Sequence, residues 1–220
     1  THGEGGSVVL TGDVSAISAT GSAQGLLVQA GSDFQAAVHN VRVEGASAAV
    51  HGAALHIGDG GTLLHQGLIE VAGTSAAATV RGINVVAGDT FSASIADVHV
   101  EGISNALGLY WQTEDHGKLV QNGTIRATTK GAGGNTGAAT ILAGNELAIA
   151  ADKVEAIAQG DDATATGVYL MAGNDLTARF RSVTATGMRG ATALTAIVQD
   201  GATLQVDRIE SVSQGEAYGL

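Results

Sequence analysis

The sequence predicts an all-β protein, a right-handed parallel β-helix (β-solenoid) of about eight coils, with roughly 27–30 residues and three short strands per coil. Three observations support this fold class. A pattern of glycine and apolar residues recurs along the 220-residue chain, and apolar residues alternate with other residues inside each repeat. The composition is also unusual, with 33 Gly, no Pro and only 3% aromatic residues. A narrow interior filled by Ala, Val, Leu and Ile accounts for it better than a globular core anchored on large aromatic side chains.

The repeat is clearest in two segments that begin at Gly25 and Gly82. The first reads GLLVQAGSDFQAAVHNVRVEG and the second reads GINVVAGDTFSASIADVHVEG. Both open with a glycine, turn at a second glycine, and end in V-x-V-x-G. The matching apolar pairs are Leu26 and Ile83, Val28 and Val85, Phe34 and Phe91, Ala36 and Ala93, Val38 and Ile95, Val41 and Val98, and Val43 and Val100.

Further copies fit the pattern with small shifts. Gly167 opens one copy, Gly137 opens another with one extra residue before the first turn, and Thr195 takes the place of the opening glycine in the last. The copies that begin at Gly52 and Gly108 are expected to carry about two extra residues in the first turn, at Gly60–Gly61 and His116–Gly117. Residues 7–21 resemble a shortened copy. We expect one solenoid domain over residues 1–220, with an array that continues past Leu220.

Each coil is expected to form three strands, such as 26–29, 34–38 and 41–44, because the apolar period within it is two. Glycines at the corners supply backbone angles that other residues adopt at a cost. Right-handed winding follows from the strong preference of parallel crossovers. A propeller would need longer units and more aromatic residues. The predicted inward ladder is Val28, Leu55, Val85, Trp111, Ile141, Leu170 and Val198.

The charge of the chain argues against two classes of partner. Its formal net charge is −11, and its ten Lys and Arg residues are spread along the sequence without a cluster. Nucleic-acid binding and polybasic membrane contact both require clustered cations, so neither is expected. No apolar run reaches 18 residues, so we expect no membrane insertion of this segment. The absence of Cys rules out a disulfide framework.

The repeat resembles the passenger β-helix of bacterial autotransporters and related large, pertactin-like adhesins. The residues that carry the resemblance are Gly25-Leu26-Leu27-Val28 through Gly45 and Gly167-Val168-Tyr169-Leu170 through Gly187. It covers nearly the whole chain and implies secretion to the cell surface, outside the outer membrane. It also implies a role in adhesion, self-association or display of loops. Because the repeated positions are structural, the resemblance transfers no functional residues.

The sequence contains no motif that points to a catalytic residue, a cofactor or a metal. A phosphate-binding loop, a zinc-protease helix, a nucleophile elbow and a stacked calcium repeat are all missing. His51, His56 and His65 share one coil but lack ligand spacing on one face, so solvent-facing imidazoles are expected. We therefore expect a non-enzymatic protein without cofactors.

One coil departs from its neighbours and carries the candidate ligand-binding residues. Tyr110 is expected to point outward in the same ladder as Tyr169, two coils away, and an inserted polar turn follows with Glu114, Asp115 and His116. Exposed tyrosines beside a polar turn suit a ligand-binding surface. The neighbouring Trp111 falls in the inward ladder and is expected in the core, with the longer turn making room for it.

Three functions remain open at this point. The first is an adhesin or autotransporter passenger segment, a non-catalytic rod that binds a host or bacterial surface protein or glycan, or a second copy of itself. The second is a polysaccharide-binding or polysaccharide-cleaving solenoid, such as a phage tailspike or a lyase, and the third is a structural spacer or S-layer-type element. The third strand displays outward charges that a cleaving enzyme could use, although a solvated face is favoured. These charges are Arg42, Glu44, Glu70, His99, Glu101, Arg126, Glu155 and Glu210.

Overall fold

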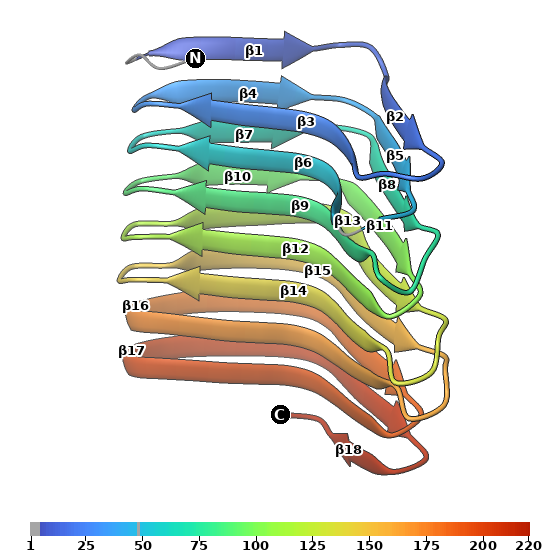
Figure 1. Cartoon of the computed structure of the whole chain (residues 1–220). Coiled ribbons are helices and arrows are strands. Elements are labelled where there is room, and N and C mark those ends of the chain that lie inside the picture. Colours follow the sequence, from blue (N-terminus) through green and yellow to red (C-terminus); the bar gives the residue numbers. More distant parts are fainter. Residues whose placement is uncertain (1–4, 48) are drawn as a thin grey trace.

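The computed structural model describes residues 5–47 and 49–220, and all the regular elements in these residues are β-strands. Parallel strands stack into a solenoid of about eight turns (Figure 1). In Figure 1 the near strands run to the left and the far strands to the right while the chain descends, so the winding is right-handed. The predicted fold class is confirmed. Among the described residues there is no long apolar helix of the kind that crosses a membrane.

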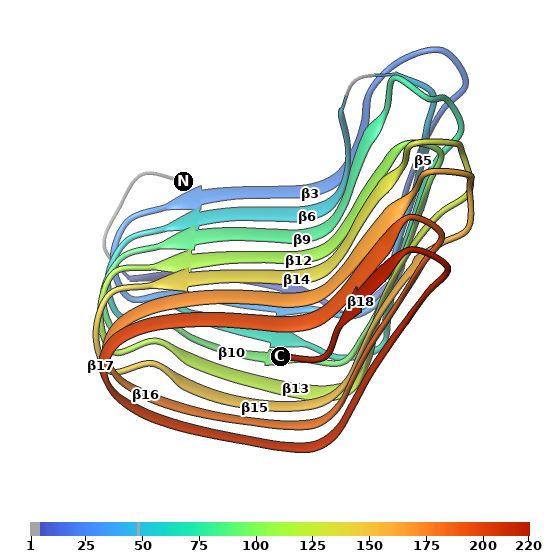
Figure 2. The same cartoon turned by 90° about the horizontal axis from the view of Figure 1, so that it is seen from below.

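Each coil contributes to three faces of the solenoid (Figure 2). The first face contains β3 (Ala23–Ala30), β6 (Ala49–Ile57), β9 (Thr79–Ala87), β12 (Asn105–Thr113) and β14 (Asn135–Ala143). The second face contains β1 (Gly6–Leu10), β4 (Phe34–Val38), β7 (Thr62–His65) and β10 (Ser92–Ile95). The third face contains β2 (Val14–Ser18), β5 (Val41–Gly45), β8 (Leu68–Gly73) and β11 (Asp97–Gly102).

Later strands run round the corners of the coil without a break. The strands β13 (Lys118–Thr129) and β15 (Ala148–Ala158) cover the second and third faces. The strand β16 (Thr164–Gly187) covers all three faces, because it pairs first with β14 and then with β15. The strand β17 (Gly190–Ser213) covers them too, because it pairs with β16 along almost its whole length. The short β18 (Glu216–Tyr218) pairs with the start of β17. Three short strands per coil therefore describe the earlier coils, and a single bent strand describes the last ones.

Equivalent residues of successive coils line up in columns perpendicular to the strands. The inward column of the first face follows the predicted ladder up to Leu170, but Leu170 pairs with Ala196 and not with Val198. The prediction of Val198 was wrong by two residues, because Thr195 does not hold the place of the opening glycine. The column consists of Val28, Leu55, Val85, Trp111, Ile141, Leu170 and Ala196.

The opening glycines also form a column, at a bend in the first-face strands. A Cβ atom at Gly25 would lie 2.5 Å from Val41 Cγ1 and 2.6 Å from the carbonyl oxygen of Gly52, so the close approach of chains favours glycine there. Two later coils place alanine at this position, Ala138 and Ala193, both fully buried. The predicted openings at Gly137 and Thr195 were therefore displaced by one and two residues.

The first turn has the same length in every coil, which contradicts the extra residues predicted at Gly60–Gly61 and His116–Gly117. Gly61 and Gly117 occupy the same column as Phe91, directly before the paired residues Thr62, Ser92 and Lys118. The sequence pattern predicts a large apolar residue, such as Phe91, after the first turn, but Gly61 and Gly117 stand at this position, so the pattern placed the end of the turn too late. Little space is left for a side chain at either position, because a Cβ atom at Gly61 would lie 3.0 Å from Phe91 Cδ2 and one at Gly117 would lie 3.1 Å from Leu147 Cδ1.

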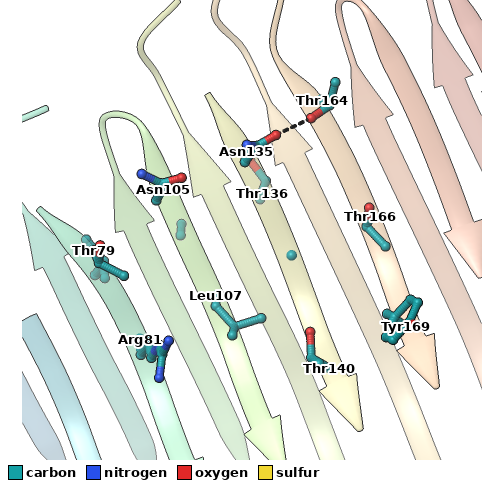
Figure 3. Close-up of a pocket in the computed structure, with 13 residues that line it drawn as sticks. Thr79, Arg81, Asn105, Leu107, Asn135, Thr136, Thr140, Thr164, Thr166 and Tyr169 are labelled. Atoms are coloured by element: carbon teal, nitrogen blue, oxygen red, sulfur yellow. Dashed lines mark hydrogen bonds between the residues drawn. The ribbon is translucent and has the colours of Figure 1, made fainter. Parts of the chain in front are cut away.

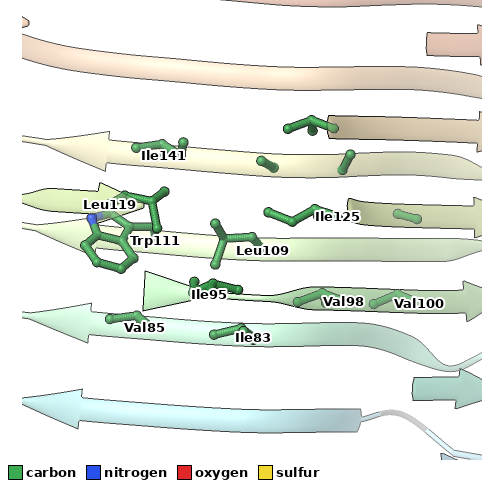
Figure 4. Close-up of a cluster of buried hydrophobic side chains, with 14 of the residues drawn as sticks. Ile83, Val85, Ile95, Val98, Val100, Leu109, Trp111, Leu119, Ile125 and Ile141 are labelled. Atoms are coloured by element: carbon green, nitrogen blue, oxygen red, sulfur yellow. The ribbon is translucent and has the colours of Figure 1, made fainter. Parts of the chain in front are cut away.

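Apolar side chains from all three faces fill the interior (Figure 4). Trp111 is fully buried, as predicted, and its ring lies 5.1 Å from the Phe91 ring. The expected longer turn beside Trp111 is not present, because the first turn of its coil has the same length as that of the preceding coil. The interior is narrow, and small residues separate the few large ones.

Three coils carry one extra residue at the second corner, and in two of them a glycine there, Gly67 or Gly123, adopts a φ angle of +113° or +136°. In both coils a polar side chain points inward just before the extra residue and accepts a hydrogen bond from the next coil. The Ala96 N–H donates to His65 Nδ1 at 3.3 Å, and the Asp152 N–H donates to Gln121 Oε1 at 3.0 Å. His65 is only 2% exposed, so the prediction of a solvent-facing imidazole was wrong for this residue.

Candidate functional site

A groove of about 390 Å³ crosses β9, β12, β14 and β16 on the first face (Figure 3). We call it the first-face groove. Two columns of outward side chains, each with one residue from each of these four strands, line the groove together with Thr140 and Tyr169 of a third column. Neighbouring strands in a sheet are about 4.8 Å apart, so the groove is about 14 Å long from β9 to β16.

The first column carries hydroxyl and amide groups. It consists of Thr79, Asn105, Asn135 and Thr164. The Thr164 hydroxyl donates to Asn135 Oδ1 at 2.5 Å, which ties the last two strands of the groove together (Figure 3). Amide groups both donate and accept hydrogen bonds, and the side chains of Asn105 and Asn135 are exposed.

The hollow of the groove lies over its smallest residues. Gly137 stands between Leu107 and Thr166 in the second column, and Thr140 stands between Tyr110 and Tyr169 in the third. Missing side-chain volume at these two neighbouring positions lowers the floor. The Tyr169 ring borders the hollow at the β16 end.

Tyr110 and Tyr169 point outward from one column, as predicted, with Thr140 on the strand between them. Their strands are therefore about 9.6 Å apart. Tyr169 lines the groove directly. The Tyr110 hydroxyl donates to Gln112 Oε1 at 2.9 Å, and its ring lies beside Arg81.

Arg81 is a groove residue that sequence reasoning did not identify. Its guanidinium carbon lies 5.6 Å from the centre of the Tyr110 ring, and its Nη1 donates to Asn84 Oδ1 at 3.4 Å. It directly precedes the opening glycine Gly82, a position occupied by Gln24 in the first full coil. The position directly before each opening glycine forms an outward column, and comparing the residues at this position in successive coils could have identified Arg81.

Glu114, Asp115 and His116 lie apart from the groove, at the first corner, and do not line it. Asp115 Oδ1 accepts hydrogen bonds from the backbone N–H and the side-chain amide of Asn145, at 2.6 and 3.1 Å. His116 Nε2 lies 3.3 Å from Glu146 Oε2, and the Gly144 N–H donates to the Glu114 carbonyl at 2.5 Å. The structure thus separates these three residues from the two tyrosines and gives each of them a contact with the next coil.

Asp115 belongs to a ladder of carboxylates and amides that runs along the first corner. Each member from Asp59 to Asn145 accepts a hydrogen bond from the backbone N–H of the equivalent residue in the next coil, at 2.6–3.1 Å, and Asn174 takes part only as the last donor. The Asn145 backbone hydrogen bond is the main reason why the pKa of Asp115 lies below its ordinary value. The members of the ladder are Asp59, Asp89, Asp115, Asn145 and Asn174.

The outward charges predicted on the third strand form a strip in which opposite charges pair. Arg42 Nε lies 3.7 Å from Glu70 Oε2, and Arg126 Nη2 lies 2.6 Å from Glu155 Oε2. Burial alone would raise the pKa of Glu155, but the hydrogen bond and charge of Arg126, with the charge of Lys153, hold that pKa below its ordinary value. The strip borders a second hollow, of about 430 Å³, whose carboxylates Glu70 and Glu101 are engaged by cations.

Metal binding finds no support in the arrangement of side chains. Within residues 5–47 and 49–220, no group of three or more His, Asp or Glu side chains is placed to hold an ion. His56 is exposed and His65 is buried, so the histidines of this coil do not share a face.

Comparison with family models, curated proteins and solved structures finds no match to this chain.

Proposed function

We propose that this chain is a non-catalytic adhesion segment of a secreted or surface-displayed bacterial protein, and that it binds a glycan in the first-face groove. The observation that carries the proposal is the lining of the groove, where a tyrosine borders exposed amides and hydroxyls. Sugars offer hydroxyl groups to such donors and acceptors, and they offer apolar ring faces to aromatic side chains. The surface location is taken from the resemblance of the repeat to autotransporter passengers.

A binding role is favoured over cleavage because of where the carboxylates are. Hydrolysis of a glycosidic bond normally needs two carboxyl groups facing each other across the substrate. The residues that line the first-face groove include no Asp or Glu. On the third face, Glu70, Glu101 and Glu155 are each paired with a cation, as expected of a solvated surface strip.

The test is binding of the whole chain to an array of immobilised bacterial and host glycans. Tyr169→Ala should weaken binding about tenfold or more, the size expected when a packed aromatic contact is lost. Tyr218→Ala is the matched control, because Tyr218 is 55% exposed and lies outside the groove. Thermal unfolding of each variant checks that the fold is intact.

Three results would contradict the proposal. Equal binding by Tyr169→Ala and Tyr218→Ala would show that the groove is not the site. If the chain binds no glycan and its molar mass, measured by light scattering, increases with concentration, self-association would be favoured. Release of shortened sugars from a bound polysaccharide would favour the cleaving solenoid instead.

A further inference from the structure

Arg81 occupies the β9 end of the first-face groove in an orientation that is fixed without any ligand. The guanidinium lies over the Tyr110 ring, 5.6 Å from its centre, and Nη1 bonds to Asn84, which is only 8% exposed. Stacking on an aromatic face restrains the plane of an arginine while leaving its other N–H groups free to donate. The side chain is therefore preorganised to receive an acceptor from the groove.

Among the described residues no carboxylate pairs with this cation, although acidic residues outnumber basic ones by 21 to 10 in the chain. Seven of the ten Lys and Arg residues form ion pairs, and in the part of the chain that the structure describes Arg81, Lys118 and Arg189 do not. A half-buried guanidinium without an anion loses solvation and gains little in return, so an anionic ligand stabilises it.

Among the described residues, the groups that face Arg81 include no carboxylate. In its own column the neighbours are His51 on β6 and Leu107 on β12. Burial, and then the charge of Arg81, lower the pKa of His51. The polar neighbours Asn84 and Tyr110 carry an amide and a phenol. An acceptor in the groove thus meets a cation with no competing carboxylate beside it.

We propose that the ligand of the groove is an acidic glycan, with one sugar carboxylate bound to Arg81. Neighbouring sugars lie along the groove toward Tyr169 and bond to the amides of Asn105 and Asn135. This inference rests on the proposed function and specifies its ligand. One cation suits a single carboxylate, whereas a densely sulfated chain would meet the net charge of −11 with only one compensating arginine.

The spacing of the groove supports a short oligosaccharide as the bound unit. Arg81 on β9 and Tyr169 on β16 are three strands apart, which is about 14 Å. An arginine binds a carboxylate through two parallel hydrogen bonds, so it fixes one end of the glycan in position and direction. Tyr169 then contacts a sugar ring at the other end, and both ends contribute to recognition.

The test is calorimetric titration of the whole chain with three acidic glycans, each paired with its carboxyl-reduced, neutral form. The probes are trigalacturonate, a hyaluronan tetrasaccharide and sialyllactose. At least one acidic member should bind about tenfold to a hundredfold tighter than its neutral form, the range expected for a charge-assisted bidentate contact. Arg81→Gln should abolish this difference, and Arg81→Lys should retain part of it.

Lys118→Gln is the matched control, because Lys118 is an exposed cation that, like Arg81, has no ion-pair partner among the described residues, and it lies outside the groove. Thermal unfolding shows whether each variant is folded. If Arg81→Gln does not fold, the affinity of Arg81→Lys for the acidic and neutral forms still decides the test. Equal affinity for acidic and neutral forms, or an effect of Arg81→Gln no larger than that of Lys118→Gln, would overturn the acidic-glycan inference. If the acidic and neutral forms bind equally and Tyr169→Ala loses both, the groove is a site for neutral glycans and only the acidic-glycan inference fails. If no glycan binds, both proposals fail.

Discussion

The rings of Trp111 and Phe91 lie 5.1 Å apart, centre to centre, with 52° between their planes. They come from adjacent coils and from different columns of the core. The Phe91 ring is flanked in its own column by Gly61 and Gly117, so large and absent side chains alternate along the axis. This alternation lets a narrow interior hold two large aromatic rings at normal packing density.

The alternation predicts that a single methyl group at Gly61 is harmful. A Cβ atom there would lie 2.5 Å from Ile57 Cγ2 and 3.0 Å from Phe91 Cδ2. We expect Gly61→Ala to lower the free energy of unfolding by about 1–3 kcal/mol, the usual cost of overpacking. Urea unfolding measures the change, with Gly12→Ala as the control, since a Cβ atom at Gly12 meets no atom within 4 Å. Equal stability of the two variants would show that Gly61 does not face the Phe91 ring.

The fold was predictable because the apolar period of two and the long repeat are both properties of the sequence. The register was less predictable wherever a column changed residue type. Ala138 and Ala193 replace the opening glycine, and Gly61 and Gly117 replace a large apolar residue, so an alignment based on residue type shifted there. Column geometry, which the sequence does not display, corrects those shifts.

The residues of the site were predictable only where the coils align without a shift. Tyr110 and Tyr169 were placed in one outward column because their coils align without shifts. Arg81 escaped notice because a lone arginine becomes informative only when its neighbours across strands are known. The burial of His65 was missed because the extra residues expected at Gly60–Gly61 moved it out of the inward column that it shares with Val38.

The inward column predicts a large difference between two adjacent positions on β9. Val85 is fully buried, whereas Val86 points to the outer face and is half-buried. We expect Val85→Asp to cost several kcal/mol, because it buries an unpaired charge between coils. Val86→Asp, the matched control, should cost much less. Thermal and urea unfolding measure both, and similar losses in the two variants would mean that the assigned register is wrong.

The corner ladder predicts that Asp115 has a structural role. Asp115→Asn keeps an oxygen that can accept from the Asn145 N–H, whereas Asp115→Ala removes it. We expect Asp115→Ala to lower the thermal unfolding temperature at pH 7 and Asp115→Asn to lower it less. Because its pKa is lowered in the folded chain, the contribution of Asp115 is present above its unfolded pKa and is lost as pH falls through the folded value. Loss of glycan binding with unchanged stability would instead assign Asp115 to a ligand site.

His65 predicts a specific loss of stability on acidification. Burial lowers the pKa of His65 from 6.5 to about 4 and outweighs the opposing effects of a hydrogen bond with the backbone of His39 and the charge of Asp97. Between these two values the unfolded chain binds a proton and the folded chain does not, so stability is complete above about pH 6.5 and declines as the pH falls toward 4. The total loss from this group is about 3 kcal/mol.

The matched variant is His65→Gln, which copies Gln121 at the equivalent corner and can still accept from the Ala96 N–H, but does not titrate. Urea unfolding of both proteins from pH 7.5 to pH 4 separates this residue from the carboxylates they share. We expect the difference in unfolding free energy between wild type and His65→Gln to shift in favour of the variant across this interval. A constant difference would show that His65 is protonated as readily in the folded chain as in the unfolded one, and that it is not held neutral inside the second corner.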